Sequence, residues 1–69
     1  MTSNAPLRFV QNARLAVVER RPNPLGTELR CSVDGAFVWG RTCFTPEELE
    51  EELVKIREDF LSRGWSLQA

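Results

Sequence analysis

The chain has 69 residues, 42% hydrophobic and 28% charged, with a formal net charge of −1 at pH 7. This length allows one domain with a thin hydrophobic core. Two cysteines and no histidine exclude the usual structural zinc sites, and no apolar run approaches the roughly 20 residues that cross a bilayer. We recognise no secretory leader, so the protein is expected to be cytoplasmic, with free thiols and without a metal or cofactor.

Charge is distributed unevenly along the chain. Residues 1–44 carry six arginines against three acidic residues, a net charge of +3, whereas residues 45–69 carry three basic and seven acidic residues, a net charge of −4. An acidic, solvated helix beside an arginine-bearing sheet explains this distribution. The alternative explanation is a polarity that orients a binding partner.

The first predicted strands lie before residue 22. Residues 1–6 are small and polar and end at a proline, so we expect a tail there, followed by one domain over residues 7–67 and a short tail at 68–69. Residues 7–21 are rich in strand-forming side chains but are interrupted at residues 11–13, which is consistent with one bent strand or with two short ones. The segment from Pro22 to Gly26 holds two prolines and a glycine, and it predicts a loop between antiparallel strands.

A β-hairpin is predicted around Asp34 and Gly35. Residues 27–33 alternate apolar and polar side chains, as a half-buried strand does, and residues 36–44 form the returning strand. An Asp-Gly pair between two such segments favours a tight turn, because glycine accepts the positive φ angle that the turn requires. In either register considered for this hairpin, Cys31 and Cys43 lie too far apart along the strands to form a disulfide.

Two registers of the hairpin are open, and they place two aromatic rings differently. If the turn has two residues, Cys31 pairs with Val38, and Phe37 and Trp39 lie on the sheet face opposite the helix. If Gly35 instead forms a bulge, Cys31 pairs with Phe37, and both rings join the core. We favour the bulge at Gly35, because a thin core needs those rings.

Residues 46–63 are predicted to form an amphipathic helix. Thr45 supplies an N-cap hydroxyl, the proline after it suits the first helical position, and Glu48 is placed to complete a capping box. Gly64 is expected to end the helix in a left-handed conformation, and Trp65 to fold back onto Phe60. The apolar face is broad enough to cover a small sheet; it consists of Leu49, Leu53, Val54, Ile56, Phe60 and Leu61.

Together these elements predict an α+β fold, in which one C-terminal helix packs across one face of an antiparallel sheet of three or four strands. Catalysis is not expected, because no histidine is present to act as a base and the glycines lack a phosphate-binding spacing. Most acidic residues occupy helical positions rather than a calcium-binding loop, so they predict a solvated surface.

Arginines interleaved with aromatic residues form the candidate interaction surface of the predicted sheet. Such side chains can contact phosphates and stack on bases, as a nucleic-acid partner would require. They can also form an exposed apolar patch that binds another protein or a second copy of the chain. The candidate residues are Arg14, Arg20, Arg30, Phe37, Trp39 and Arg41.

The segment TCFTPEE at residues 42–48, which opens a helix after strands joined by an Asp-Gly turn, allows one comparison. Over about residues 27–62 the chain resembles the arm-type DNA-binding domain at the N-terminus of phage integrases, and also short phage and bacterial proteins of three strands and a helix. That family reads DNA with its sheet, so the resemblance implicates Arg30, Phe37, Trp39 and Arg41. The chain departs from the family in its acidic helix and in the lack of a following recombinase domain.

Two functions follow as expectations. The first is a non-enzymatic protein-interaction module that self-associates, as a homodimer, through a free sheet face or edge. The alternative is a small nucleic-acid-binding or regulatory protein of phage or mobile-element type, acting through arginine-bearing strands.

Overall fold

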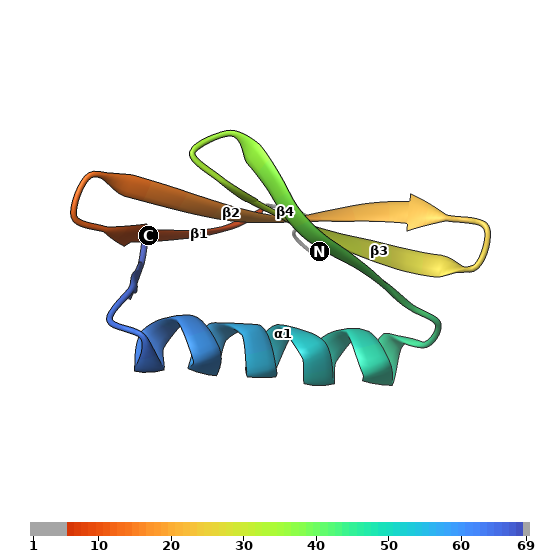
Figure 1. The fold of residues 1–69 in the computed structure, drawn as a ribbon. Coiled ribbons are helices and arrows are strands. Elements are labelled where there is room, and N and C mark those ends of the chain that lie inside the picture. Colours follow the sequence, from red (N-terminus) through yellow and green to blue (C-terminus); the bar gives the residue numbers. More distant parts are fainter. Residues whose placement is uncertain (1–5, 69) are drawn as a thin grey trace.

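The computed structural model describes residues 6–68 and has an α+β fold, a five-stranded antiparallel sheet with one helix across one face (Figure 1). The α+β class and the C-terminal helix are confirmed, but the sheet has five strands rather than three or four. Its order is β4-β3-β2-β1-β5. The elements are β1 Leu7–Gln11, β2 Arg14–Asn23, β3 Gly26–Val33, β4 Ala36–Cys43, α1 Pro46–Ser62 and β5 Ser66–Leu67.

Both of the strands that the sequence left open at residues 7–21 form, and β5 is a further strand that was not predicted. Residues 7–23 form two strands because Asn12, with a φ of 55°, turns the chain within two residues and lets Gln11 pair with Arg14. Asparagine is one of the few residues other than glycine that tolerates this left-handed conformation. β5 forms where the chain returns beside β1 after the helix, and the Gln68 N–H donates to the Arg8 carbonyl at 2.8 Å.

The predicted loop from residue 22 to residue 26 is shorter in the structure. β2 continues through Pro22 and Asn23, and only Pro24 and Leu25 form the turn. Proline is tolerated here because β1 pairs with β2 only as far as Val18, so that the end of β2 lies at a local sheet edge. The Asn23 side chain accepts a hydrogen bond from the Leu25 N–H at 2.9 Å, which closes the turn.

The β3–β4 hairpin adopts neither predicted register. The turn has two residues, both with positive φ angles, so Ser32 pairs with Phe37. An extra residue, Val38, then shifts the register, and Cys31 pairs with Trp39. The predicted bulge at Gly35 is therefore wrong; the irregularity lies three residues later. Because a bulge changes the side on which following side chains project, Phe37 and Trp39 lie on opposite faces of the sheet.

The caps of α1 agree with the prediction except that the capping box is incomplete, because the Glu48 carboxylate binds the N–H of Phe44 rather than that of the N-cap Thr45. The Thr45 hydroxyl accepts a hydrogen bond from the Glu48 N–H at 3.1 Å, and the Glu48 carboxylate accepts one from the Phe44 N–H at 3.0 Å. At the other end the Trp65 N–H donates to the Phe60 carbonyl at 3.0 Å, as a Schellman cap requires. The Trp65 ring meets the Phe60 ring edge-on, with centroids 5.3 Å apart.

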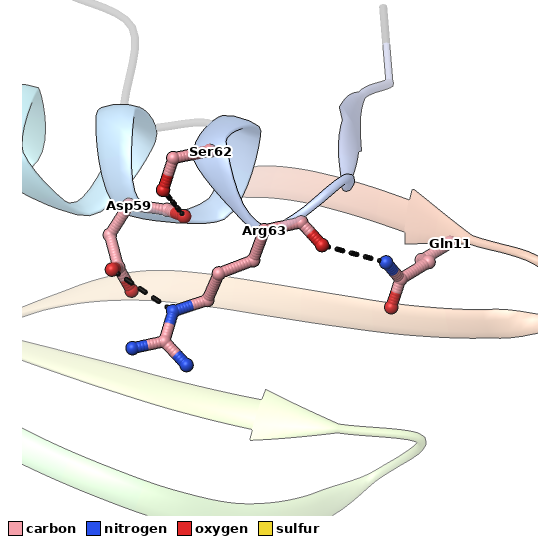
Figure 2. A network of polar contacts seen from close by, with 4 residues as sticks. All are labelled: Gln11, Asp59, Ser62 and Arg63. Carbon is pink, nitrogen blue, oxygen red and sulfur yellow. Dashed lines mark hydrogen bonds and ion pairs between the residues drawn. The ribbon is translucent and has the colours of Figure 1, made fainter.

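A polar network joins the end of α1 to β1 (Figure 2). The Gln11 side-chain amide donates to the Arg63 carbonyl at 2.9 Å. The Arg63 guanidinium in turn contacts the Asp59 carboxylate at 3.0 Å, and the Ser62 hydroxyl donates to the Asp59 carbonyl at 2.8 Å. The β1–β2 hairpin is therefore fixed to the helix by a specific contact at the place where the last helical carbonyls need partners.

The core lies between α1 and the facing side of the sheet. Phe9 stacks on Phe60 with ring centroids 4.4 Å apart and planes at 7°. The helix covers the sheet with a narrower stripe than the sequence predicts, because Val54 and Leu61 remain about half exposed. No helix among residues 6–68 has the length and apolar character needed to cross a membrane. The buried residues are Phe9, Ala16, Val18, Leu29, Cys31, Cys43 and Ile56.

Candidate interaction surface

The face of the sheet turned away from α1, here called the outer face, is not covered by any element in residues 6–68 (Figure 1). Side chains alternate between the two faces along each strand, so the positions between the buried residues project outward. The two parts of this face differ in chemistry. We call them the apolar end, which consists of Val10, Leu15, Val17 and Phe37, and the charged square, which consists of Glu19, Arg21, Glu28 and Arg30.

The apolar end lies beside the two turns at Asn12 and Asp34. Val10 pairs directly with Leu15 across β1 and β2, and Phe37 follows the turn between β3 and β4. The Phe37 side chain is 56% exposed and that of Leu15 is 37% exposed. These side chains project from three strands onto one face, with Ser32 of β3 between Val17 and Phe37, so they offer exposed apolar area to a partner.

The charged square alternates in sign along the strands and across them. Glu19 on β2 pairs with Arg30 on β3, and Arg21 pairs with Glu28 one step further along. Within β2, Arg21 Nη2 lies 3.9 Å from Glu19 Oε2, and within β3, Arg30 Nη1 lies 3.6 Å from Glu28 Oε1. Both distances exceed that of a charge-assisted hydrogen bond, so each guanidinium keeps donors for a further carboxylate.

Phe37 joins the two parts of the outer face. The Arg30 guanidinium carbon lies 4.6 Å from the centroid of the Phe37 ring, within the range of a cation–π contact. The ring also lies across Gly40, where a methyl group would be in van der Waals contact with the ring edge. The small residue thus leaves space for the ring beside Gly40, with much of the Phe37 surface still exposed.

The six residues predicted from the sequence do not form one surface. Arg30 and Phe37 lie on the outer face, as described above. Trp39 packs against the core on the helix side. Arg41 also lies on the helix side, where its Nη1 atom contacts Glu52 Oε2 of α1 at 2.7 Å.

The other two predicted arginines also point toward the helix side of the sheet. The Arg14 guanidinium lies 5.8 Å from the centroid of the Trp65 ring and 3.6 Å from the Asp34 carboxylate. Arg20 lines a groove between the sheet and α1, together with Leu53. The interleaving of arginine and aromatic residues in the sequence therefore does not correspond to one face of the fold.

Sequence reasoning missed several residues of the outer face. Val10, Val17 and Glu19 were not singled out, although the alternation of side chains along residues 14–21 could have placed the latter two on one face. The missing information was the two-residue turn at Asn12, because it sets the register of β1 against β2. Without that register, Val10 could not be assigned to the same face.

The thiols of Cys31 and Cys43 are not activated as nucleophiles. Cys31 and Cys43 are free and buried in the core. Burial raises the pKa of the Cys31 thiol; burial, and then the carboxylates of Glu52 and Glu48, raise the pKa of the Cys43 thiol. Both therefore stay protonated near neutral pH, where a thiolate would be required for nucleophilic attack. No three cysteine or carboxylate side chains within residues 6–68 are grouped as metal ligands.

Comparison with known proteins found no matching protein-family model, no matching curated protein and no matching solved structure.

Proposed function

We propose that the chain is a non-enzymatic protein-interaction module that binds a second copy of itself through the outer face. The observation that supports this most directly is the exposed Phe37 ring, which shares an uncovered sheet face with Val10, Leu15 and Val17. Domains are built from layers that bury their apolar faces, and here one face of the sheet has such a layer while the other has none among residues 6–68. Association would bury the apolar end and enlarge the core of a very small domain.

The distribution of charge favours protein over nucleic acid as the partner. Arg21 and Arg30 on the outer face stand next to Glu19 and Glu28, so no concentrated positive patch is available for a row of phosphates. Three of the arginines that the sequence offered for phosphate contact, at positions 14, 20 and 41, lie on the helix side of the sheet.

Equilibrium sedimentation over a range of micromolar concentrations tests this proposal. We expect a monomer–dimer equilibrium for the unchanged chain, and a dissociation constant about tenfold or more higher for Phe37→Ser, since exposed aromatic side chains commonly dominate such interfaces. Leu25→Ser is the matched control, because Leu25 is 68% exposed but lies in the β2–β3 turn. A monomer at every concentration would contradict the proposal.

A gel-shift titration with mixed DNA and RNA addresses the alternative partner. We expect no binding that weakens with added salt. Salt-sensitive binding that is lost in Arg30→Ala would instead support the nucleic-acid-binding function.

A further inference from the structure

The arrangement of charges on the outer face also specifies how two copies would meet. We infer that they pack face to face about a two-fold axis that runs parallel to the strands, between β2 and β3; this inference rests on the proposed function. Rotation about this axis exchanges the positions of β2 and β3 while leaving the position along the strands unchanged. The two sheets then pack in the aligned manner of β-sandwiches, with strand directions within about 30° of each other.

The charged square is complementary to itself under this rotation. Glu19 and Arg30 occupy one row across β2 and β3, and Arg21 and Glu28 occupy the next outward-facing row. After the rotation, Glu19 of one copy faces Arg30 of the other, and Arg21 faces Glu28. Opposite charges therefore meet at all four positions. The sign of the charge alternates along the strands and across them. A second copy of the chain therefore presents an opposite charge to each of these four side chains.

The same rotation also covers part of the apolar end, because Val17 of one copy meets Ser32 of the other, and Phe37 meets Arg8. One row of the outer face runs from Arg8 on β1 through Val17 and Ser32 to Phe37 on β4. Exchange of β1 with β4 brings Arg8 of one copy over Phe37 of the other. Arg8 forms no ion pair with any residue from 6 to 68, whereas the ring that it would cover is 56% exposed. In the dimer, the Arg8 guanidinium of one copy would form a cation–π contact with the Phe37 ring of the other.

A two-fold axis perpendicular to the strands fits less well. An axis between the two rows of the charged square would also join opposite charges, Glu19 to Arg21 and Arg30 to Glu28. It would, however, place the row of Val17 over the row of Asn23 and Gly26 at the end of the β2–β3 hairpin, and move Val10 and Leu15 past the turn, where they stay exposed. Since apolar burial provides most of the affinity and interfacial charges mainly orient the copies, the parallel axis is preferred.

A charge-exchange experiment tests the axis. Glu19→Arg places two guanidinium groups at each of two contacts of the dimer, and Arg30→Glu places two carboxylates there. Each variant alone should dimerise about tenfold or more weakly than the unchanged chain, because like charges would meet. An equimolar mixture should form a heterodimer of near-original affinity, since opposite charges meet again. Native mass spectrometry separates the heterodimer from both homodimers by mass.

The matched control is an equimolar mixture of Glu19→Arg with Arg21→Glu. This pair restores opposite charges only for the axis perpendicular to the strands, so we expect no recovery. Circular dichroism and thermal unfolding show whether each variant is folded. If either member of the first pair does not fold, Arg21→Glu mixed with Glu28→Arg gives the same test at the second contact of the parallel axis.

The outcomes separate the two proposals. Recovery in the first mixture and not in the control supports the parallel axis. Recovery only in the control, recovery in neither, or variants that dimerise alone as well as the unchanged chain would overturn the axis but leave self-association standing. A chain that stays monomeric without any substitution would overturn both.

Discussion

The side-chain carboxylate of Asp34 accepts a hydrogen bond from the backbone N–H of Leu15 at 2.9 Å, and the Asp34 N–H donates to the Leu15 carbonyl at 2.8 Å. The pairing of β2 with β3 reaches only as far as Ala16 and Val33, so Leu15 has no partner within β3. Asp34, in the β3–β4 turn, makes the hydrogen bonds to Leu15 that a residue of β3 would otherwise make. The contact holds the β3–β4 turn beside β2, so that Leu15 and Phe37 both belong to the apolar end. A single acidic side chain therefore shapes the candidate interaction surface from its edge.

Substitutions at Asp34 test its two roles together, the turn conformation and the hydrogen bond to Leu15. Asp34→Ala should lower the free energy of unfolding by about 1–2 kcal/mol, because it leaves the Leu15 N–H without this acceptor and places alanine at a φ of 51°. Asp34→Asn keeps an acceptor and tolerates the conformation, so it should cost less than about 0.5 kcal/mol. Urea denaturation measures both values. Equal losses in the two variants would contradict the prediction, because only Asp34→Asn keeps the acceptor and tolerates the turn conformation.

Two glycines with positive φ angles should differ strongly in their tolerance of alanine. At Gly26, where φ is 151°, a side chain would overlap the carbonyl oxygen of Cys43 in β4. At Gly35, where φ is 85°, a side chain would meet no atom within 4 Å. We expect Gly26→Ala to lower the free energy of unfolding by about 3 kcal/mol or more, and Gly35→Ala by about 1 kcal/mol. The same urea titration checks the order, which would be contradicted by similar losses.

The stability of the fold should decrease in mildly alkaline solution because of the buried thiols. Burial raises the pKa of both Cys31 and Cys43 in the folded chain, so the unfolded chain loses these protons at lower pH. The stabilisation is complete below the pKa of the unfolded thiols and is lost as pH rises through the raised pKa values. The chain has no tyrosine and a single lysine, so few other groups titrate in this range.

Urea denaturation between neutral pH and about pH 10 should therefore show a falling free energy of unfolding, which becomes flatter in the double variant Cys31→Ala with Cys43→Ala. An equally steep decrease in the double variant would assign the effect to other groups.

Two substitutions near Cys43 should shift its thiol pKa in opposite directions. The Glu52 carboxylate raises this pKa and the Arg41 guanidinium lowers it. Glu52→Gln should therefore increase the rate at which iodoacetamide alkylates Cys43 at mildly alkaline pH, and Arg41→Gln should decrease it. Cys31 is the internal reference in each sample, because Glu52 and Arg41 are not among the causes of its raised pKa. Peptide mass spectrometry gives the ratio of the two rates, and a change in the same direction for both variants would contradict the prediction.

The sequence by itself determined the elements that depend on near neighbours. The helix begins at Thr45 and ends before Gly64 as expected, since the caps are hydrogen bonds between residues three to five positions apart. The position of the turn at Asp34-Gly35 was predictable for the same reason, although the favoured bulge at Gly35 was wrong. Such interactions are encoded within a short window of residues, and the order of types in that window is sufficient to recognise them.

Only the tertiary structure decided which side chains share a face. The bulge at Val38 separates Phe37 from Trp39, and the turn at Asn12 brings Val10 beside Leu15. The positions of this bulge and this turn are set by pairing between strands and by burial against α1. A shift of the register by one residue moves every later side chain of a strand to the other face. The outer face is therefore a property of the register, which depends on contacts distant in the sequence and has no signature within a single strand.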